Sequence, residues 1–170
     1  MKKTKGEVLV GIIIGSESDL DIMREAEKVL TEFGLGCELT VASAHRSPKK
    51  VERYASEAKA KGLKVLIVGA GMAAHLPGVV AAHTTLPVIG VPLNVSPLNG
   101  LDSLLSIVQM PSGIPVATMS IGAPGARNAG LLSIAILALH DKTLERKLDE
   151  YRLILAKKID EADGRVGGHR

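Results

Sequence analysis

The stretch Val8-Leu-Val-Gly-Ile-Ile-Ile-Gly-Ser-Glu-Ser-Asp19 decides the fold, because a continuous apolar run ends there at a glycine and a polar loop. We predict a buried strand at residues 8–14, since apolar runs of this length are typical of strands that are covered on both faces. Apolar residues then recur every three or four positions over residues 20–33, which indicates an amphipathic helix. Ser18 and Asp21 resemble a capping box at its start.

The alternation of strand and helix continues along the chain. Ser47 and Pro48 predict another helix start, with serine at the cap and proline at the first helical position. Crossovers of these lengths join parallel strands, so the predicted fold class is α/β: a three-layer α/β/α sandwich with a parallel sheet and flavodoxin-like winding. Further strands are predicted at residues 37–42, 65–68, 88–91 and 115–118, and helices at 48–61, from 75 to about 84, and at 101–109, 126–139 and 144–162.

Length and composition suit one compact domain. The chain has 170 residues, and we expect a single domain at residues 1–163 with a disordered tail at 164–170. Hydrophobic residues make up 46% of the chain but aromatic residues only 2%, which predicts a core of Val, Ile, Leu and Ala. A lone cysteine, Cys37, excludes an intrachain disulfide framework and suits a reducing compartment.

Charge and hydropathy argue against nucleic-acid and membrane partners. The net charge of +3 includes Lys2, Lys3, Lys5, Arg165 and Arg170 at the chain ends, and removing these five positive charges leaves −2. The fold itself therefore has no predicted basic patch for nucleic acid, and stacking platforms for bases also need aromatic rings. No signal peptide is visible, and the most apolar helix, at residues 129–139, is about half the length that spans a bilayer.

Three short polar or glycine-rich segments each follow a predicted strand: Gly15–Asp19, Ser43–Arg46 and Gly69–Gly78. In an open parallel sheet, the carboxyl ends of the strands meet at one edge, where ligands bind. We therefore expect the three segments to form one shared site for a small molecule.

The first segment joins a strand to a helix N-terminus, where backbone N–H groups and the helix dipole favour a phosphate. Ser16 and Ser18 can add hydroxyl donors. Asp19 carries its own negative charge, so it is better suited to accept hydrogen bonds from sugar hydroxyls or to favour the helix dipole. The alternative is an ordinary tight turn capped by Ser18.

The second segment, Ser43-Ala-His-Arg46, supplies a histidine and an arginine before the next helix. The arginine fork suits bidentate binding of phosphate, and histidine suits proton transfer near neutral pH. The alternative is that Arg46 pairs with a carboxylate and His45 is a surface residue.

The third segment, Gly69-Ala-Gly-Met-Ala-Ala74, matches the pattern G-x-G-x-x-A of dinucleotide-binding folds. In dinucleotide-binding folds this pattern follows the first strand, and an acidic residue stands about 20 positions later. Here the pattern follows the third predicted strand, and no acidic residue stands at that distance. The glycines more simply bring the backbone close to a different small ligand. His75 can contact that ligand or the backbone, and it has no nearby cysteine or carboxylate that would indicate a metal site.

Taken in order, these motifs resemble one family of purine biosynthesis, that of N5-carboxyaminoimidazole ribonucleotide mutase, also called the catalytic subunit of phosphoribosylaminoimidazole carboxylase. The resemblance covers residues 8–140. It rests on Gly15-Ser-x-Ser-Asp19, Ser43-Ala-His-Arg46, Gly69-Ala-Gly-x-Ala-Ala-His-Leu-Pro-Gly78, Leu86-Pro-Val-Ile-Gly-Val-Pro92, the stretch from Gly100 to Pro111, and Pro115-Val-Ala-Thr118.

The resemblance implies a cytoplasmic homo-octamer that acts on a ribonucleotide without a cofactor, that is, without metal, nucleotide or biotin. It implies that His45 transfers protons as the catalytic residue, while Ser16, Asp19 and Arg46 bind the ribose phosphate. The remaining residues expected to bind substrate are Ser18, Ser43, Gly71, Met72, Ala73, Ala74, His75 and Leu76. This chain departs from the usual family pattern at Met72, which is commonly glycine, and at Ser47, which is commonly threonine.

Three alternatives to a mutase stay open at this point. One branch of the family carboxylates aminoimidazole ribonucleotide directly with carbon dioxide, although the stretch Ala73-Ala-His-Leu-Pro77 resembles the mutase branch. A nucleotide or flavin-mononucleotide binding module would share the fold, but the chain has few aromatic rings to flank a flavin. The third is a regulatory or assembly subunit without chemistry, which the apolar helix at residues 129–139 suggests.

Overall fold

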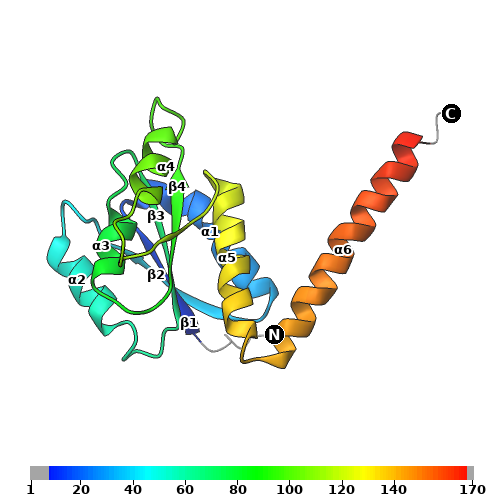
Figure 1. Cartoon of the computed structure of the whole chain (residues 1–170), viewed down its shortest axis with the longest axis horizontal. Coiled ribbons are helices and arrows are strands. Elements are labelled where there is room, and N and C mark those ends of the chain that lie inside the picture. Colours follow the sequence, from blue (N-terminus) through cyan, green and yellow to red (C-terminus); the bar gives the residue numbers. More distant parts are fainter. Residues whose placement is uncertain (1–7, 168–170) are drawn as a thin grey trace. The chain divides into compact units, whose positions relative to one another are not determined.

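One parallel sheet of five strands organises the computed structural model, which describes residues 8–167 (Figure 1). The strand order is β2-β1-β3-β4-β5, and every adjacent pair runs parallel. The α/β fold class predicted from the alternating pattern is therefore confirmed. The strands are β1 (Val8–Ile14), β2 (Gly36–Val41), β3 (Val65–Gly71), β4 (Val88–Leu93) and β5 (Ala117–Thr118).

The helices alternate with these strands, and the chain divides into two compact units, Met1–Ser133 and Ile134–Arg170. The single domain expected at residues 1–163 stays a prediction. Of the cations assigned to the chain ends, Lys2, Lys3, Lys5 and Arg170 lie outside the described residues. Within residues 8–167, no helix combines the length and the apolar character needed to cross a membrane. The helices are η1 (Glu17–Asp19), α1 (Leu20–Glu32), α2 (Pro48–Glu57), α3 (Leu76–Ala82), α4 (Leu101–Val108), α5 (Ala123–Ala138) and α6 (Lys142–Gly167).

The inner strands β1 and β3 are buried on both faces, which explains their continuous apolar sequences. Residues 10–14 of β1 and 65–70 of β3 are all buried. Ile13 of β1 belongs to the hydrophobic cluster that also holds Val51 of α2 and Val80 of α3. The other face of the sheet packs against α1. Covering both faces removes apolar surface from water, the main favourable contribution to folding.

Helix α1 approaches β3 closely at Gly69, near the carboxyl end of that strand. A Cβ atom built on Gly69 would lie 2.6 Å from Sδ of Met23, a fully buried residue of α1. The absence of a side chain at Gly69 thus lets α1 lie directly against the strand. The close approach positions the start of α1 beside the loops that follow β1 and β3.

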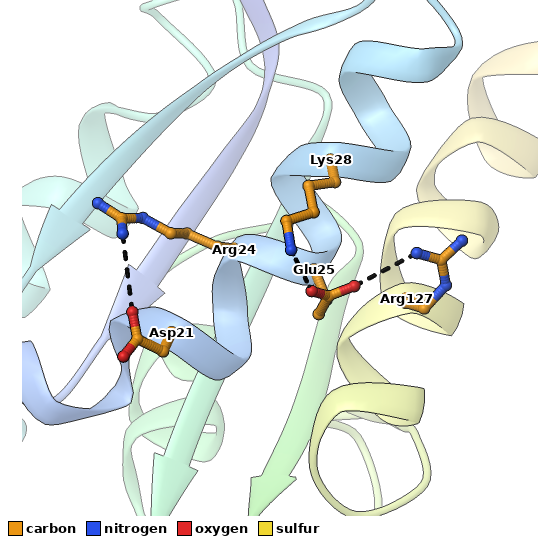
Figure 2. Close-up of polar contacts among 5 residues, drawn as sticks. All are labelled: Asp21, Arg24, Glu25, Lys28 and Arg127. Atoms are coloured by element: carbon orange, nitrogen blue, oxygen red, sulfur yellow. Dashed lines mark hydrogen bonds and ion pairs between the residues drawn. The ribbon is translucent and has the colours of Figure 1, made fainter.

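Helix α1 also packs against the first part of α5. A Cβ atom on Gly130 would lie 3.1 Å from both the carbonyl oxygen of Ala26 and Cβ of Val29. Figure 2 shows the ionic contact beside this packing: the carboxylate of Glu25 lies between the Lys28 ammonium and the Arg127 guanidinium, with Arg127 Nη1 3.3 Å from Glu25 Oε2. Hydrogen bonds from Lys28 and Arg127 lower the pKa of Glu25.

Several boundaries differ from the sequence predictions for identifiable reasons. The capping pair is Ser16 and Asp19 rather than Ser18 and Asp21, because a short 3-10 turn, η1, precedes α1. Strand β5 has two residues instead of four. Pro115, at the start of the predicted four-residue strand, has no N–H to donate to a sheet.

Helix α6 extends to Gly167, five residues beyond its predicted end at residue 162. The expected disordered tail is therefore wrong for residues 164–167, and residues 168–170 lie outside the described part of the chain. A single glycine such as Gly164 costs about 1 kcal/mol in a helix, which does not suffice to end it. An i,i+4 contact of 3.9 Å between Lys157 and Glu161 also supports this last part of the helix.

We predict that Gly69→Ala destabilises the protein by about 1–3 kcal/mol, because the new methyl group would displace Met23 from a packed core. Urea unfolding measures this loss. The matched control is the double variant Gly69→Ala with Met23→Ala, in which the smaller side chain leaves room for the methyl group. The two single losses should then exceed the loss in the double variant, and strict additivity would contradict the proposed contact.

Candidate active site

A cleft of about 480 Å³ opens at the carboxyl-terminal edge of the sheet. Strands β2 and β3 lie on opposite sides of β1, so the strand order reverses at this point of the sheet. The cleft lies at this reversal, which is where open α/β sheets bind ligands. All predicted site residues except Ala74 line this cleft, together with Gly15, Ala44, Ala70 and Val95. The three sequence segments that were expected to share a site therefore line a single cavity.

Asp19 holds the loop that follows β1. Its Oδ2 accepts a hydrogen bond of 3.1 Å from the backbone N–H of Ser16, and the Ser18 hydroxyl lies 3.4 Å from Oδ1. Only 5% of Asp19 is exposed. Burial raises the pKa of the Asp19 carboxyl, although hydrogen bonds from Ser16 and Ser18 oppose this shift. Asp19 is thus a structural acceptor for its own loop as well as part of the cleft lining.

Arg46 connects the loop after β2 to the loop after β1. Its Nη2 donates a hydrogen bond of 2.9 Å to the carbonyl oxygen of Gly15, and its backbone N–H donates to Oγ of Ser43 at 3.2 Å. None of the ion pairs found among residues 8–167 involves Arg46. The guanidinium brings a positive charge to the cleft, where it also interacts electrostatically with the Asp19 carboxyl, and its fork of N–H donors suits an anion.

Two histidines from different loops meet in the cleft. Nε2 of His45 lies 2.8 Å from Nδ1 of His75, and the rings stand edge to face with centroids 5.0 Å apart. One of these nitrogens donates the hydrogen bond and the other accepts it, so the tautomers of the two rings are linked. Sequence reasoning considered His75 as a ligand or backbone contact and missed this pair. The two residues follow β2 and β3, and β1 lies between those strands.

The segment after β3 supplies the apolar part of the lining. Met72 has a positive φ of 57° and is 60% exposed. Ala74, by contrast, is 1% exposed and packs in the hydrophobic core, so its side chain does not reach the cleft. Val95, which follows β4, also joins the lining. No local motif marked Val95, because its place depends on the pairing of β4 with β3.

A protein-family model described as AIR carboxylase matches residues 9–158. The chain belongs to the AIR carboxylase family. Relatives named N5-carboxyaminoimidazole ribonucleotide mutase support this membership. The relative from Pyrococcus horikoshii is 52% identical, and the match covers 93% of this chain and 88% of that relative. The relative from Bacillus subtilis is 59% identical, and the match covers 85% of this chain and 89% of that relative.

Solved structures agree with the AIR carboxylase assignment. PurE of Treponema denticola superimposes with a TM-score of 0.84 at 30% sequence identity, covering 92% of this chain and 97% of that protein. The resemblance drawn from the ordered motifs is therefore confirmed. The region matched by the family model includes every segment that lines the cleft.

We predict that Asp19→Asn changes how stability depends on pH. Because folding raises the pKa of Asp19, its contribution to stability is complete below the ordinary value of 3.8 and is lost as the pH rises through the raised value. The asparagine variant does not ionise there, so its free energy of unfolding should rise relative to wild type over that range. Urea unfolding at a series of pH values measures the difference.

The matched control for Asp19→Asn is Asp21→Asn, which removes a carboxylate that is 94% exposed on the same helical turn. If the free energy of unfolding rose with pH by the same amount in both variants, relative to wild type, the cause would be a general effect of net charge. That result would contradict a specific effect of burial at Asp19.

Proposed function

We propose that this chain is an N5-carboxyaminoimidazole ribonucleotide mutase, an isomerase of purine biosynthesis. It would move the carboxylate from the exocyclic nitrogen of its substrate to ring carbon C4, giving 4-carboxy-5-aminoimidazole ribonucleotide. The observation that carries the proposal is the His45–His75 pair, located in a cleft that also contains the guanidinium of Arg46. The names of relatives at 51–59% identity support the same activity.

The polar loops would hold the ribose phosphate. Arg46 donates in-plane N–H groups to the phosphate, and the hydroxyls of Ser16, Ser18 and Ser43 add further donors. Asp19 accepts hydrogen bonds from the ribose hydroxyls. Because Arg46 also binds the Gly15 carbonyl, phosphate binding and the arrangement of the first two loops are coupled.

His45 would move one proton in each direction. In the first step, the bond between the carbamate carbon and the exocyclic nitrogen breaks, and the nitrogen takes a proton from His45 while carbon dioxide is released. In the second step, ring carbon C4 forms a bond to the carbon dioxide, and neutral His45 removes the C4 proton to restore aromaticity. The proton given in the first step is thus recovered in the second, and the net reaction is an isomerisation.

His75 acts as a positioning residue for His45. Its Nδ1 lies 2.8 Å from Nε2 of His45, and the two nitrogens share a hydrogen bond. The other ring nitrogen of His45, Nδ1, is then the atom that exchanges the proton with the substrate. The hydrogen bond also fixes the orientation of the His45 ring. Holding reacting groups in one orientation is a large source of rate enhancement.

The direct test is to supply N5-carboxyaminoimidazole ribonucleotide and, separately, aminoimidazole ribonucleotide with bicarbonate. We expect efficient turnover of the first substrate. Turnover of the second alone would assign the chain to the direct carboxylase branch, which releases or fixes carbon dioxide as a lyase. Activity with neither would overturn the proposal and leave a binding or assembly role.

We predict that His45→Asn lowers kcat by about 100-fold or more, since it removes the group that transfers protons. Ribonucleotide affinity, measured by calorimetry with aminoimidazole ribonucleotide, should change little. Retained turnover would contradict the catalytic role of His45.

Substitutions of His75 separate positioning from folding. Asparagine places a hydrogen-bonding group near the position of Nδ1, whereas leucine of similar size has none. His75→Leu should therefore lower kcat and displace its pH profile, and His75→Asn should restore part of both. Equal profiles in the two variants would contradict the proposed hydrogen bond to His45.

We predict that Arg46→Lys raises KM by about 10- to 100-fold, because charge-assisted hydrogen bonds contribute roughly 1.5–3 kcal/mol and lysine loses the fork geometry. The value of kcat should change less than KM. Steady-state kinetics over a range of substrate concentrations measures both. An unchanged KM in a variant that folds normally would contradict a phosphate-binding role.

We also propose that the chain forms a homo-octamer in the cytoplasm, as the family resemblance implies. Exposed apolar side chains support an assembly, since contiguous apolar surface in water marks interaction sites. On α4 these are Leu101, Leu105 and Val108, and on α6 they include Leu153 and Ile159. Light scattering of the purified protein measures the assembly size.

A further inference from the structure

The loop that carries His45 and Arg46 is short and lies open to solvent. It consists of residues 43–47 and ends where α2 begins, at Pro48. Both His45 and Arg46 are exposed, and the contact of this loop with the hydrophobic core comes from Ala44. Burial therefore contributes little to fixing the two polar side chains, so the backbone of the loop has to be held by other contacts.

Ser47 closes this loop through its hydroxyl group. Its Oγ accepts a hydrogen bond of 2.9 Å from the backbone N–H of Ser43, and the hydroxyl donates to the Ser43 carbonyl oxygen at 3.2 Å. The backbone N–H of Ser47 donates to the same carbonyl oxygen at 2.9 Å. Three hydrogen bonds thus join the two ends of the loop, and two of them depend on the hydroxyl.

The hydroxyl of Ser47 makes these bonds in place of capping the helix. Serine before proline is typical of a helix cap, but the Ser47 side chain makes no hydrogen bond to the first turn of α2. Ser47 also does not line the cleft that contains His45 and Arg46. A hydroxyl has one proton to donate, and that of Ser47 is directed at the Ser43 carbonyl oxygen. Its partner is therefore the loop backbone.

The position of Ser43 in turn determines that of Arg46. Oγ of Ser43 accepts hydrogen bonds from the backbone N–H of Arg46 at 3.2 Å and from its Nε at 3.4 Å. The guanidinium then donates to the Gly15 carbonyl oxygen in the loop after β1. A chain of hydrogen bonds thus runs from Ser47 through Ser43 and Arg46 to the neighbouring loop. His45 stands inside the same closed loop, so its ring is placed by the same backbone.

We infer that Ser47 is a positioning residue that holds His45 and Arg46 in place for the reaction, an inference that rests on the proposed function. Ser47→Ala would remove the acceptor of the Ser43 N–H and free the two ends of the loop. Since reacting groups held in one orientation contribute strongly to rate, a looser His45 lowers kcat. A looser Arg46 loses the geometry of its charge-assisted hydrogen bonds and raises KM.

Steady-state kinetics of Ser47→Ala and two matched variants test the inference. We expect Ser47→Ala to lower kcat and to raise KM by about 10-fold each, the size of effect that follows from losing one hydrogen bond. Ser47→Thr keeps the hydroxyl and should recover most of both losses. Ser56→Ala makes the same chemical change on α2, where the hydroxyl donates to the Arg53 carbonyl oxygen of the helix itself. Both constants should equal those of wild type in this control.

A double variant separates the effect that acts through Arg46 from the effect on His45. In the Arg46→Lys background, Ser47→Ala should add little to KM, because the guanidinium fork that Ser47 positions is already absent. The same substitution should still lower kcat, since His45 is present. A further 10-fold rise in KM in the double variant would contradict positioning through Arg46.

Hydrogen exchange of the backbone N–H groups at residues 43–47 tests the loop closure without turnover. We expect exchange about 10-fold faster in Ser47→Ala than in wild type, and unchanged exchange in Ser47→Thr and Ser56→Ala. If Ser47→Ala does not fold, Ser47→Cys gives the same test, because a thiol of similar size is only a weak donor and acceptor.

Unchanged kcat and KM in Ser47→Ala would overturn the inference, and faster exchange in that case would show a merely structural role. The mutase proposal would remain intact. Absence of isomerisation in wild type would instead overturn the proposed function, while faster exchange in Ser47→Ala would still show that Ser47 holds the loop.

Discussion

The pairing of β1 with both β2 and β3 is the constraint on which the rest of the structure depends. Parallel hydrogen bonding aligns Ile14 with Val41 on one side and with Gly69 on the other, so β1 and β2 end at the same level and β3 ends two residues further on. The loops that follow these strands have no other reason to meet, since their sequences are far apart. The cleft and its hydrogen bonds are therefore consequences of strand register.

Within the cleft, groups that are costly in a folded protein gather at one place. Asp19 is an almost fully buried carboxyl with a raised pKa, Met72 has a left-handed backbone, and Arg46 brings a guanidinium charge into the cleft. The surrounding structure tolerates them because β1 and β3 bury long apolar runs and α1 packs tightly at Gly69. Such local conflicts with stability are expected where binding and chemistry take place.

The sequence predicted correctly those elements that are specified by neighbouring residues, such as an apolar run or a proline at a helix start. The bounds of β1 agree with prediction because an apolar run of that length has one favourable state in a covered sheet. Helix α2 begins at Pro48 because proline favours the first helical position, whereas the Ser47 hydroxyl bonds to the backbone of Ser43 and does not cap the helix. Helix α1 begins at Leu20 as predicted, but its capping pair differed because two overlapping Ser/Asp pairs fit the same pattern. The end of α6 differed because one glycine stops a helix only when the flanking turns are weak.

By itself, the sequence determined the α/β class, the edge of the sheet that carries the site, and the residue types gathered there. All three follow from hydrophobic periodicity and from the positions of polar residues after strands, which are properties of neighbouring residues. Tertiary structure alone decided that His45 would contact His75, that Ala74 would be buried and that Val95 would join the lining. These contacts depend on strand order and packing between distant segments, and no local pattern contains that information.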